Sequence, residues 1–209
     1  MKKHSRVTIV DYGMGNLWSV ANAIHYLGAE TEICKSPEKI RNAEVLLLPG
    51  VGSFFRAMDR LRATGLAEAL MEAVVVRKRK ILGICLGMQL MAEQGVEDGE
   101  SRGLGWIPGK VERFSPLDLG KLKLPHIGFN RVTGNAQSRL FDELGPAPDF
   151  YFVHSFRLLP VPSSGHASVC HYGVDFLAAY EQENIYGVQF HPEKSQTNGL
   201  RLLKNFLTA

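Results

Sequence analysis

Short apolar runs alternate with segments of helical periodicity through the first half of the chain, and this alternation restricts the fold more than any other feature. Because each apolar run is followed by a helix-period segment, the pattern is typical of βα units and of a parallel sheet covered by helices. We expect strands at 7–11, 30–34, 45–48 and 80–84, and helices at 17–27 with Asn16 as cap, from Pro37, at 54–61 and at 66–76.

The pattern changes after Gly99, where glycine and proline separate shorter alternating segments. Such segments favour hairpin-like strands in a mixed or antiparallel arrangement. The expected elements are strands at 106–114, 150–156, 167–180 and 185–190 and a closing amphipathic helix at 199–207. Because we find neither repeats nor a linker, we expect residues 1–209 to form one α/β domain. Its central, mostly parallel sheet would be flanked by helices, with antiparallel strands added in the C-terminal half.

Composition excludes several classes of protein. The 209 residues are 45% hydrophobic, which is enough to bury a full core. The longest apolar runs are far shorter than the roughly 20 residues that cross a bilayer. The basic start at 1–6 is not followed by an apolar stretch of signal-peptide length. We therefore expect a cytoplasmic protein without a membrane segment. The net charge of +3 is small and the acidic and basic residues are interspersed, so we expect no nucleic-acid partner. We interpret the basic run at 77–80 as a solvated helix end.

No cofactor or metal is expected from the remaining signals. The three cysteines have no paired spacing, which argues against disulfides and a zinc site. Gly13-Met14-Gly15 imitates a dinucleotide-binding loop, but Trp18 occupies the third glycine position and excludes the close approach of helix and strand. Five histidines show no metal-ligand spacing, namely His25, His126, His154, His166 and His171.

Gly83-Ile84-Cys85-Leu86-Gly87 is the sharpest local motif. It lies between an apolar strand and a helical segment, as in a nucleophile elbow with cysteine as the nucleophile. The flanking glycines allow backbone to approach backbone at the sharp turn, and the nucleophile itself adopts a strained conformation. A helix N-terminus stabilises a thiolate. The alternative, a small buried cysteine beside packing glycines, requires no further partner.

A second motif supplies the groups that a nucleophilic cysteine needs. His191 follows the expected strand at 185–190, and Glu193 comes two positions later, after Pro192. A thiolate that attacks an amide needs a general base, and this base needs an acceptor that fixes its tautomer. Because residues two apart in extended backbone point the same way, Glu193 is able to reach His191. We therefore expect Cys85, His191 and Glu193 to form a catalytic triad.

The attacked carbonyl becomes an oxyanion, which needs two N–H donors. The elbow supplies one donor from Leu86. Pro49-Gly50-Val51-Gly52 follows the neighbouring apolar strand and is the candidate for the other, at Val51 or Gly52. In a purely structural interpretation, the same four residues form a tight strand-to-helix turn. The two interpretations are compatible.

The motifs resemble the class I, or triad, glutamine amidotransferases and, within them, the glutaminase subunits of imidazole glycerol phosphate synthase. The resemblance runs over essentially the whole chain and implies a flavodoxin-like α/β fold. The motifs that carry it are Asp11-Tyr12-Gly13-Met14-Gly15-Asn16, Leu48-Pro49-Gly50-Val51-Gly52-Ser53, Gly83-Ile84-Cys85-Leu86-Gly87-Met88-Gln89, Leu124-Pro125-His126-Ile127-Gly128-Phe129-Asn130, Tyr151-Phe152-Val153-His154-Ser155-Phe156 and Gly187-Val188-Gln189-Phe190-His191-Pro192-Glu193-Lys194-Ser195.

The resemblance also implies roles for further residues. It implies L-glutamine as substrate and a (β/α)₈-barrel cyclase subunit as the partner in a heterodimer, which receives the ammonia and makes imidazole glycerol phosphate and AICAR in histidine biosynthesis. The partner would activate the glutaminase through rotation of the Gly50–Val51 peptide, so we expect a bulky residue at Gly50 to reduce activity without unfolding the chain. The implied glutamine-binding residues are Gln89, Gly52, Glu97, His154, Ser155 and Phe156, and the implied partner-facing residues are Asn16, Pro125, Ile127, Phe129, Asn130 and Lys194.

Other functions stay open at this point. Many relatives place methionine and tryptophan where this chain has Ile127 and Phe129, so a paralogous subunit that supplies ammonia to another synthase, for example one that amidates a sugar nucleotide, is an alternative. A free-standing hydrolase of γ-glutamyl bonds would keep the triad but work without a partner. A flavodoxin-like binding or redox module would need only an oxidisable Cys85.

Overall fold

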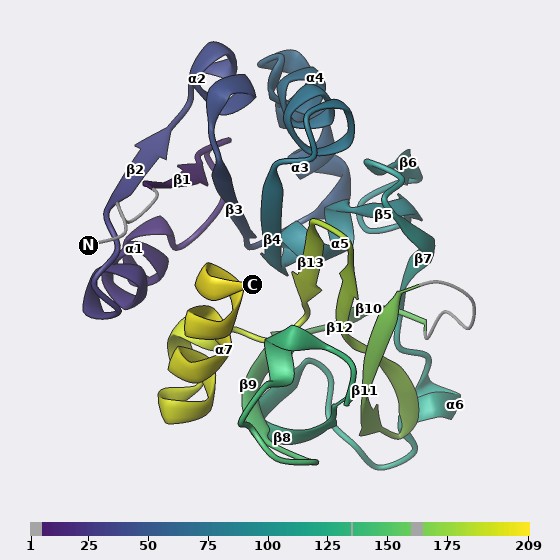
Figure 1. Ribbon diagram of the computed structural model, residues 1–209. Coiled ribbons are helices and arrows are strands. Elements are labelled where there is room, and N and C mark those ends of the chain that lie inside the picture. The colour runs from purple at the N-terminus through teal and green to yellow at the C-terminus, as the bar shows by residue number, and fades with distance from the viewer. Residues whose placement is uncertain (1–5, 135, 160–164) are drawn as a thin grey trace.

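A computed structural model describes residues 6–134, 136–159 and 165–209, so most of the basic N-terminal segment lies outside the described residues (Figure 1). Its larger sheet has nine strands in the order β2-β1-β3-β4-β13-β12-β11-β8-β9. The pairings from β2 to β13 are parallel, and those from β13 to β9 are antiparallel. This arrangement matches the expected α/β class, with the antiparallel part in the C-terminal half.

The βα part follows the expected elements closely. Asn16 lies at the N-cap of α1, but its side chain makes no capping hydrogen bond, whereas Ser36 and Ser53 accept such bonds at α2 and α3. The expected helix at 66–76 is an α-helix that continues as a π-helical turn. The bounds are β1 Val7–Val10, α1 Leu17–Tyr26, β2 Thr31–Cys34, α2 Pro37–Asn42, β3 Val45–Gly50, α3 Phe54–Ala63, α4 Leu66–Met71, the π-turn Glu72–Val76, β4 Lys80–Cys85, α5 Leu86–Leu90 and β13 Ile185–Val188.

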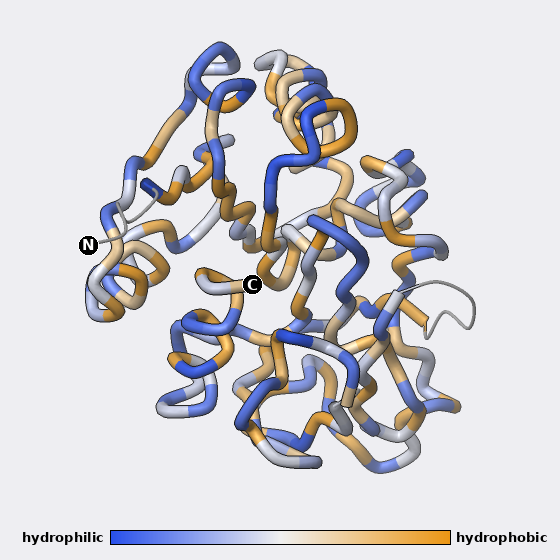
Figure 2. The backbone as a smooth tube through the Cα atoms, in the orientation of Figure 1, coloured by the Kyte–Doolittle hydropathy of each residue, from blue (hydrophilic) through white to orange (hydrophobic). Residues whose placement is uncertain are grey.

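Helices cover both faces of the parallel strands because alternate strand residues point to opposite faces. On one face, Leu47 and Ile84 pack with residues of α1 and α7 in a single core. On the other face, Leu46 and Ile81 pack with α2, α3 and α4. Figure 2 shows hydrophobic residues along the ends of β3 and β4 that meet near the middle of the molecule. Both faces of these strands are therefore buried, as expected for continuous apolar runs.

The C-terminal half departs more from the expectations. The segment expected as one strand at 167–180 is a hairpin that turns at Gly173, whose φ of +74° favours glycine. β9 corresponds to the expected strand at 150–156, but its partner β8 lies in a segment where the sequence predicted no strand. A second sheet has the order β10-β7-β5-β6. The bounds are β5 Ala92–Gly95, β6 Ser101–Arg102, β7 Ile107–Arg113, α6 Pro116–Leu119, β8 His126–Thr133, the 3₁₀ turn Arg139–Phe141, β9 Asp149–His154, β10 Phe156–Leu158, β11 His166–Tyr172, β12 Val174–Gln182, the 3₁₀ turn Pro192–Lys194 and α7 Gln196–Thr208.

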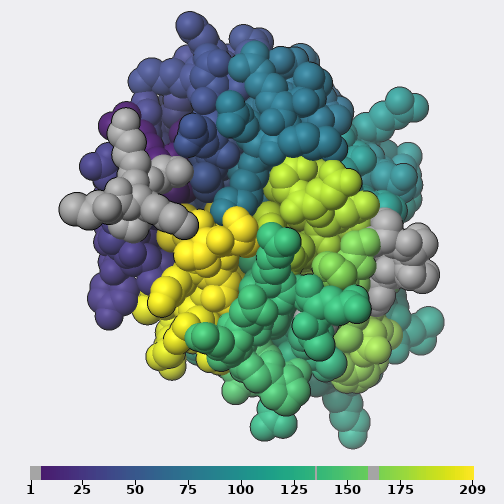
Figure 3. All heavy atoms as spheres, in the orientation of Figure 1, coloured from purple at the N-terminus to yellow at the C-terminus, as the bar shows by residue number. Residues whose placement is uncertain are grey.

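The run at 77–80 is not simply a solvated helix end. Arg77 and Lys78 form surface ion pairs with Glu72 and Glu183. Lys80 begins β4 and donates from Nζ to the carbonyls of Phe206 (2.7 Å) and Leu207 (3.3 Å) near the end of α7. In the space-filling view of Figure 3, α7 lies at the surface between the N-terminal segments and the middle of the chain. Lys80 thus fastens the last helix to the first half of the fold.

No helix within the described ranges is both long and apolar enough to cross a membrane.

We predict that Lys80→Met lowers the free energy of unfolding by about 1 kcal/mol, because the last carbonyls of α7 lose a charged donor. Lys78→Met is the matched control, since it removes only an exposed ion pair, worth about 0–1 kcal/mol. Equilibrium unfolding in urea measures both variants. Equal effects of the two substitutions would contradict the assignment to Lys80.

Candidate active site

Cys85 lies at the turn from β4 into α5 in a strained backbone conformation. Its φ of 54° and ψ of −110° are unusual for a residue with a side chain. The turn is possible because the flanking glycines permit close contacts: a Cβ on Gly87 would lie 1.6 Å from the carbonyl oxygen of Leu48. The expected nucleophile elbow is therefore present in the backbone, with Cys85 6% exposed.

His191 and Glu193 lie behind the elbow as a buried pair. Nδ1 of His191 is 2.8 Å from Oε1 of Glu193, and the two side chains are 4% and 2% exposed. The backbone N–H of His191 donates to the carbonyl of Tyr151, which fixes the segment after β13. The carboxylate therefore orients the imidazole, and the remaining ring nitrogen, Nε2, has no hydrogen-bond partner among the described residues.

The electrostatics of His191 favour its protonated form. Burial by itself lowers the pKa of His191, but interactions with the Cys85 thiol and the Glu193 carboxylate outweigh it and raise the pKa to about 10. The arrangement therefore provides a nucleophile and a nearby proton donor in one place, which is the chemistry of acyl transfer.

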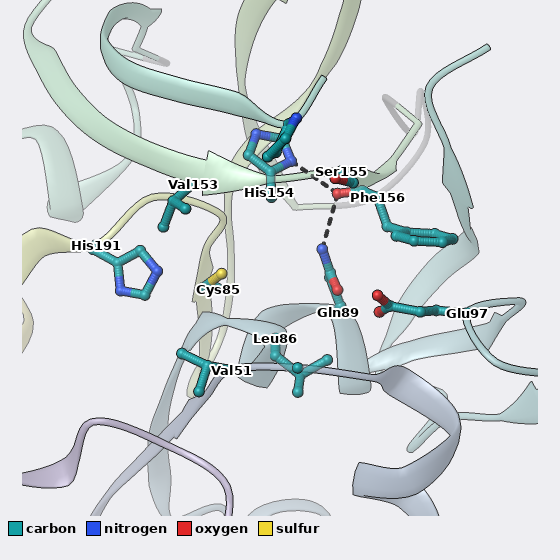
Figure 4. A pocket seen from close by; sticks show the side chains of 12 residues that line it. Val51, Cys85, Leu86, Gln89, Glu97, Val153, His154, Ser155, Phe156 and His191 are labelled. Atoms are coloured by element: carbon teal, nitrogen blue, oxygen red, sulfur yellow. Dashed lines mark hydrogen bonds between the residues drawn. The ribbon is translucent and has the colours of Figure 1, made fainter. Parts of the chain in front are cut away.

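A pocket of about 320 Å³ opens in front of Cys85. Figure 4 shows the sulfur between His191 on one side and Gln89 on the other. The pocket brings together most of the residues expected from the sequence, and Glu193 is placed behind it. Its lining consists of Val51, Gly52, Cys85, Leu86, Gln89, Glu97, Pro125, Val153, His154, Ser155, Phe156 and His191.

Hydrogen bonds fix the orientation of the Gln89 amide. Its Nε2 donates to the carbonyl of Phe156 (3.0 Å, Figure 4) and to Oε1 of Gln189 (2.9 Å). Because both N–H groups are used, Oε1 of Gln89 stays available as an acceptor. Glu97 lines the same pocket, and burial raises the pKa of its carboxyl. The two side chains offer acceptors to a positively charged group.

His154 is held by two hydrogen bonds inside the protein. Its Nδ1 donates to the carbonyl of Phe156 (2.8 Å), and its Nε2 is 3.0 Å from Nδ1 of His126. Burial lowers the pKa of His154 to about 3 and that of His126 to about 4, so both rings are neutral. Because a carbonyl only accepts, His126 must donate to His154. Both ring nitrogens of His154 are therefore occupied, and His154 steadies the Phe156 carbonyl.

The expected oxyanion-hole residues border the sulfur, and their surroundings are tight. Gly50 ends β3 opposite Cys85. A Cβ on Gly50 would lie 2.0 Å from the hydroxyl oxygen of Tyr12. This hydroxyl is buried without a hydrogen-bond partner among the described residues, and burial, together with the charge of Cys85, raises the pKa of Tyr12. A larger residue at Gly50 would therefore have to displace the Tyr12 side chain, so we expect a loss of stability in addition to the expected loss of activity.

The expected partner-facing residues are mostly exposed. Ile127 is 59% and Phe129 49% exposed on β8, and Asn16 and Lys194 are also exposed. Phe129 contacts the ring of Tyr151 on the neighbouring strand, and the ammonium of Lys194 lies over the same ring. Asn130 is half-buried because its amide approaches His126 and donates to a backbone carbonyl. Pro125 lines the pocket, so this surface adjoins the site.

Sequence reasoning missed three residues of the site, namely Gln189, His126 and Tyr12. Each lies inside a motif that was noticed, but no spacing rule assigns it a contact. Gln189 lies two positions before His191 and has the same side-chain direction in extended backbone, which is a signal that was available. No group of three or more potential metal ligands occurs among the residues that the structure describes.

We predict that Cys85→Ala lowers the pKa of His191 from about 10, because burial still disfavours the charge while the support from Cys85 is lost. The ring then becomes neutral at a lower pH than in the unmodified chain. Histidine-selective ¹⁵N NMR titration measures this change, with His166 as an internal reference. An unchanged titration would contradict contact between the two side chains.

We predict that Gly50→Ala lowers the free energy of unfolding by about 1–3 kcal/mol through overpacking against Tyr12. Tyr12→Phe removes the hydroxyl that the new methyl group would meet. The double variant should therefore recover part of the loss, and thermal or urea unfolding of all four proteins completes the cycle. Strict additivity would contradict the contact.

Comparison with known proteins agrees with this geometry. Residues 8–209 match the glutamine amidotransferase class-I family. The chain is 46% identical to imidazole glycerol phosphate synthase subunit HisH 2 of Vibrio vulnificus, over 97% of this chain and 94% of that protein. It is also 46% identical to subunit HisH 1 of Campylobacter jejuni, over 96% and 98%.

Solved structures share the fold at low sequence identity. PurLQS from Thermotoga maritima has a TM-score of 0.71 at 18% identity over 98% of both chains. A structure described as a glutamine amidotransferase has a TM-score of 0.73 at 18% identity over 96% of this chain and 97% of that one. From the matched family and the near full-length relatives, the chain belongs to the class I glutamine amidotransferases and, within them, to the HisH subunits.

Proposed function

We propose that the chain is a glutaminase subunit in which Cys85, His191 and Glu193 release ammonia from L-glutamine. The observation that carries the proposal is the buried His191–Glu193 pair beside a cysteine in a strained elbow, within one pocket. Family membership supports the same chemistry. The triad assignment is ours and rests on this geometry.

The reaction proceeds in two halves. The Cys85 thiolate attacks the side-chain amide carbon of glutamine, and N–H groups at Leu86 and at Val51 or Gly52 stabilise the oxyanion. Protonated His191 gives its proton to the departing nitrogen, which leaves as ammonia, and a γ-glutamyl thioester forms. Water then attacks the thioester, His191 takes the proton of this water, and glutamate leaves as the thiolate is restored.

The lining of the pocket supports the proposed binding of the substrate's α-amino and α-carboxylate groups. Oxygens of Gln89 and Glu97 accept from the ammonium group, because Gln89 presents Oε1 and Glu97 a carboxyl to the same space. We assign the α-carboxylate to the segment from His154 to Phe156, with Ser155 as a donor. His154 contributes through the backbone it positions, since both of its ring nitrogens have partners.

We further propose that residues 1–209 act as one domain that delivers ammonia to a (β/α)₈-barrel cyclase subunit in a heterodimer. The relatives are named as subunits of imidazole glycerol phosphate synthase, which supports a role in histidine biosynthesis. The proposed contact surface consists of Asn16, Ile127, Phe129, Asn130 and Lys194, with Pro125 at the pocket. A closed passage keeps ammonia unprotonated and nucleophilic. A cytoplasmic location fits this role.

A paralogous partner is the second candidate. The relatives of Vibrio vulnificus and Campylobacter jejuni are named HisH 2 and HisH 1. Phe129 provides an aromatic ring at the contact surface without an indole N–H, and it is half-exposed. The chain would then supply ammonia to another amidating synthase.

Glutaminase assays with and without a barrel cyclase test the proposal. We expect turnover to rise at least tenfold with the correct partner, and a glutamine-derived electrophile to label Cys85 alone among the three cysteines. Cys85→Ala should abolish both turnover and labelling. Full turnover without a partner would indicate a free-standing γ-glutamyl hydrolase, and labelling of Cys34 or Cys170 would contradict the assignment.

A further inference from the structure

Gln189 lies directly beside Cys85. In the chain it comes between the end of β13 and His191. β13 pairs with β4 in the register Val188↔Ile84, so the next residue of each strand, Gln189 and Cys85, are neighbours. Gln189 is 0% exposed, and its backbone N–H donates to the carbonyl of Ala178. Its side chain is therefore fully buried next to the Cys85 sulfur.

The direction of the Gln189 amide follows from one backbone carbonyl. The carbonyl of Phe156 only accepts, so the side-chain atom of Gln89 that faces it must be the nitrogen. This nitrogen also donates to Gln189, which must therefore present its oxygen to Gln89. Nε2 of Gln189 then points toward Cys85, at 3.6 Å from the sulfur. No other assignment of the two amides satisfies all three contacts.

We propose that Gln189 is a further catalytic residue, whose side-chain N–H donates to the Cys85 sulfur and stabilises the attacking thiolate. The inference rests on the proposed function and adds to it a side-chain donor to the sulfur. Hydrogen bonds to an ionised acceptor are roughly twice as strong as neutral ones, so the donor favours the charged form over the thiol. Once the thioester has formed, the sulfur carries no charge and the bond weakens.

The same amide couples the nucleophile to the substrate-binding residue. Gln189 accepts from Gln89, and Gln89 in turn keeps its oxygen toward the pocket. A substrate ammonium group that binds this oxygen polarises the Gln89 amide and strengthens its donation to Gln189. Neighbouring hydrogen bonds in a chain reinforce one another, so occupancy of the pocket increases donation to the sulfur.

The test is the pH dependence of Cys85 alkylation by iodoacetamide in the free chain, without glutamine. Only the thiolate reacts, so the midpoint of the rate profile reports the stability of the charged form. Gln189→Met keeps the volume but removes the donor. We expect its midpoint to rise by about one pH unit and its rate below the midpoint to fall about tenfold, as a charge-assisted bond predicts. Peptide mapping assigns the alkylated cysteine.

Two further variants complete the design. Gln89→Met leaves Gln189 in place but removes the donor that fixes its amide, so we expect a smaller shift in the same direction. A Gln89 that served substrate binding alone would leave the profile unchanged, because no substrate is present. Gln182→Met is the matched control. This glutamine of β12 accepts from Tyr180 and pairs with Ile185 at the start of β13, so its profile should equal that of the unmodified chain.

Unchanged midpoints in folded Gln189→Met and Gln89→Met would overturn the inference. A merely structural Gln189 would alter thermal stability and leave the midpoint in place. If Gln189→Met does not fold, the profile of Gln89→Met decides by the same criterion. Failure of the proposed function looks different, since the glutamine-derived electrophile would then fail to label Cys85 in the unmodified chain.

Discussion

The parallel pairing of β13 with β4 is the contact on which the site depends. It joins Val188 to Ile84 and so brings two segments together that are about a hundred positions apart in sequence. β3 pairs with the other edge of β4 and places Gly50 opposite Cys85. Because parallel strands end at the same edge of a sheet, Cys85, His191 and the turn after β3 all converge there. A shift of one residue in this register would separate them.

The polar groups of the site are held by partners outside the reaction. Glu193 orients His191, and the Phe156 carbonyl orients Gln89. His126 and His154 steady that carbonyl from behind. In a water-poor interior each oriented dipole acts more strongly than in solution, and little reorganisation is needed during the reaction. The half-buried Asn130 extends this network to the surface that we assign to the partner.

The sequence predicted the βα half, and it singled out the three residues of the proposed triad, because their signals are local. The apolar runs, the flanking glycines of the elbow and the His-Pro-Glu segment each lie within a few positions. β8 was missed because its apolar residues Ile127 and Phe129 occupy exposed positions, and Gly128, with φ of +127°, lies between them. The pairing His126↔His154 depends on β8 meeting β9, so it was not accessible before the strand was known.

Local sequence also does not determine which way a side-chain amide points. The proposed roles of Gln89 and Gln189 follow from which atom faces which neighbour, and this requires the contact between β10 and α5. The buried hydroxyl of Tyr12 against Gly50 is a similar case, because only the packed loop shows that the space is filled. Residue type at a motif position thus predicts chemistry, while the packed neighbours decide its orientation.

The central claim is that the Cys85 sulfur attacks glutamine with His191 as the proton carrier. Acid quenching during turnover with L-glutamine, followed by mass spectrometry of the peptides, tests this claim most directly. The account predicts one γ-glutamyl group on the peptide that contains Cys85, and slower formation of this adduct in His191→Asn, which lacks the proton donor for the departing nitrogen. Release of ammonia without this adduct, or an adduct on Cys34 or Cys170, would contradict it.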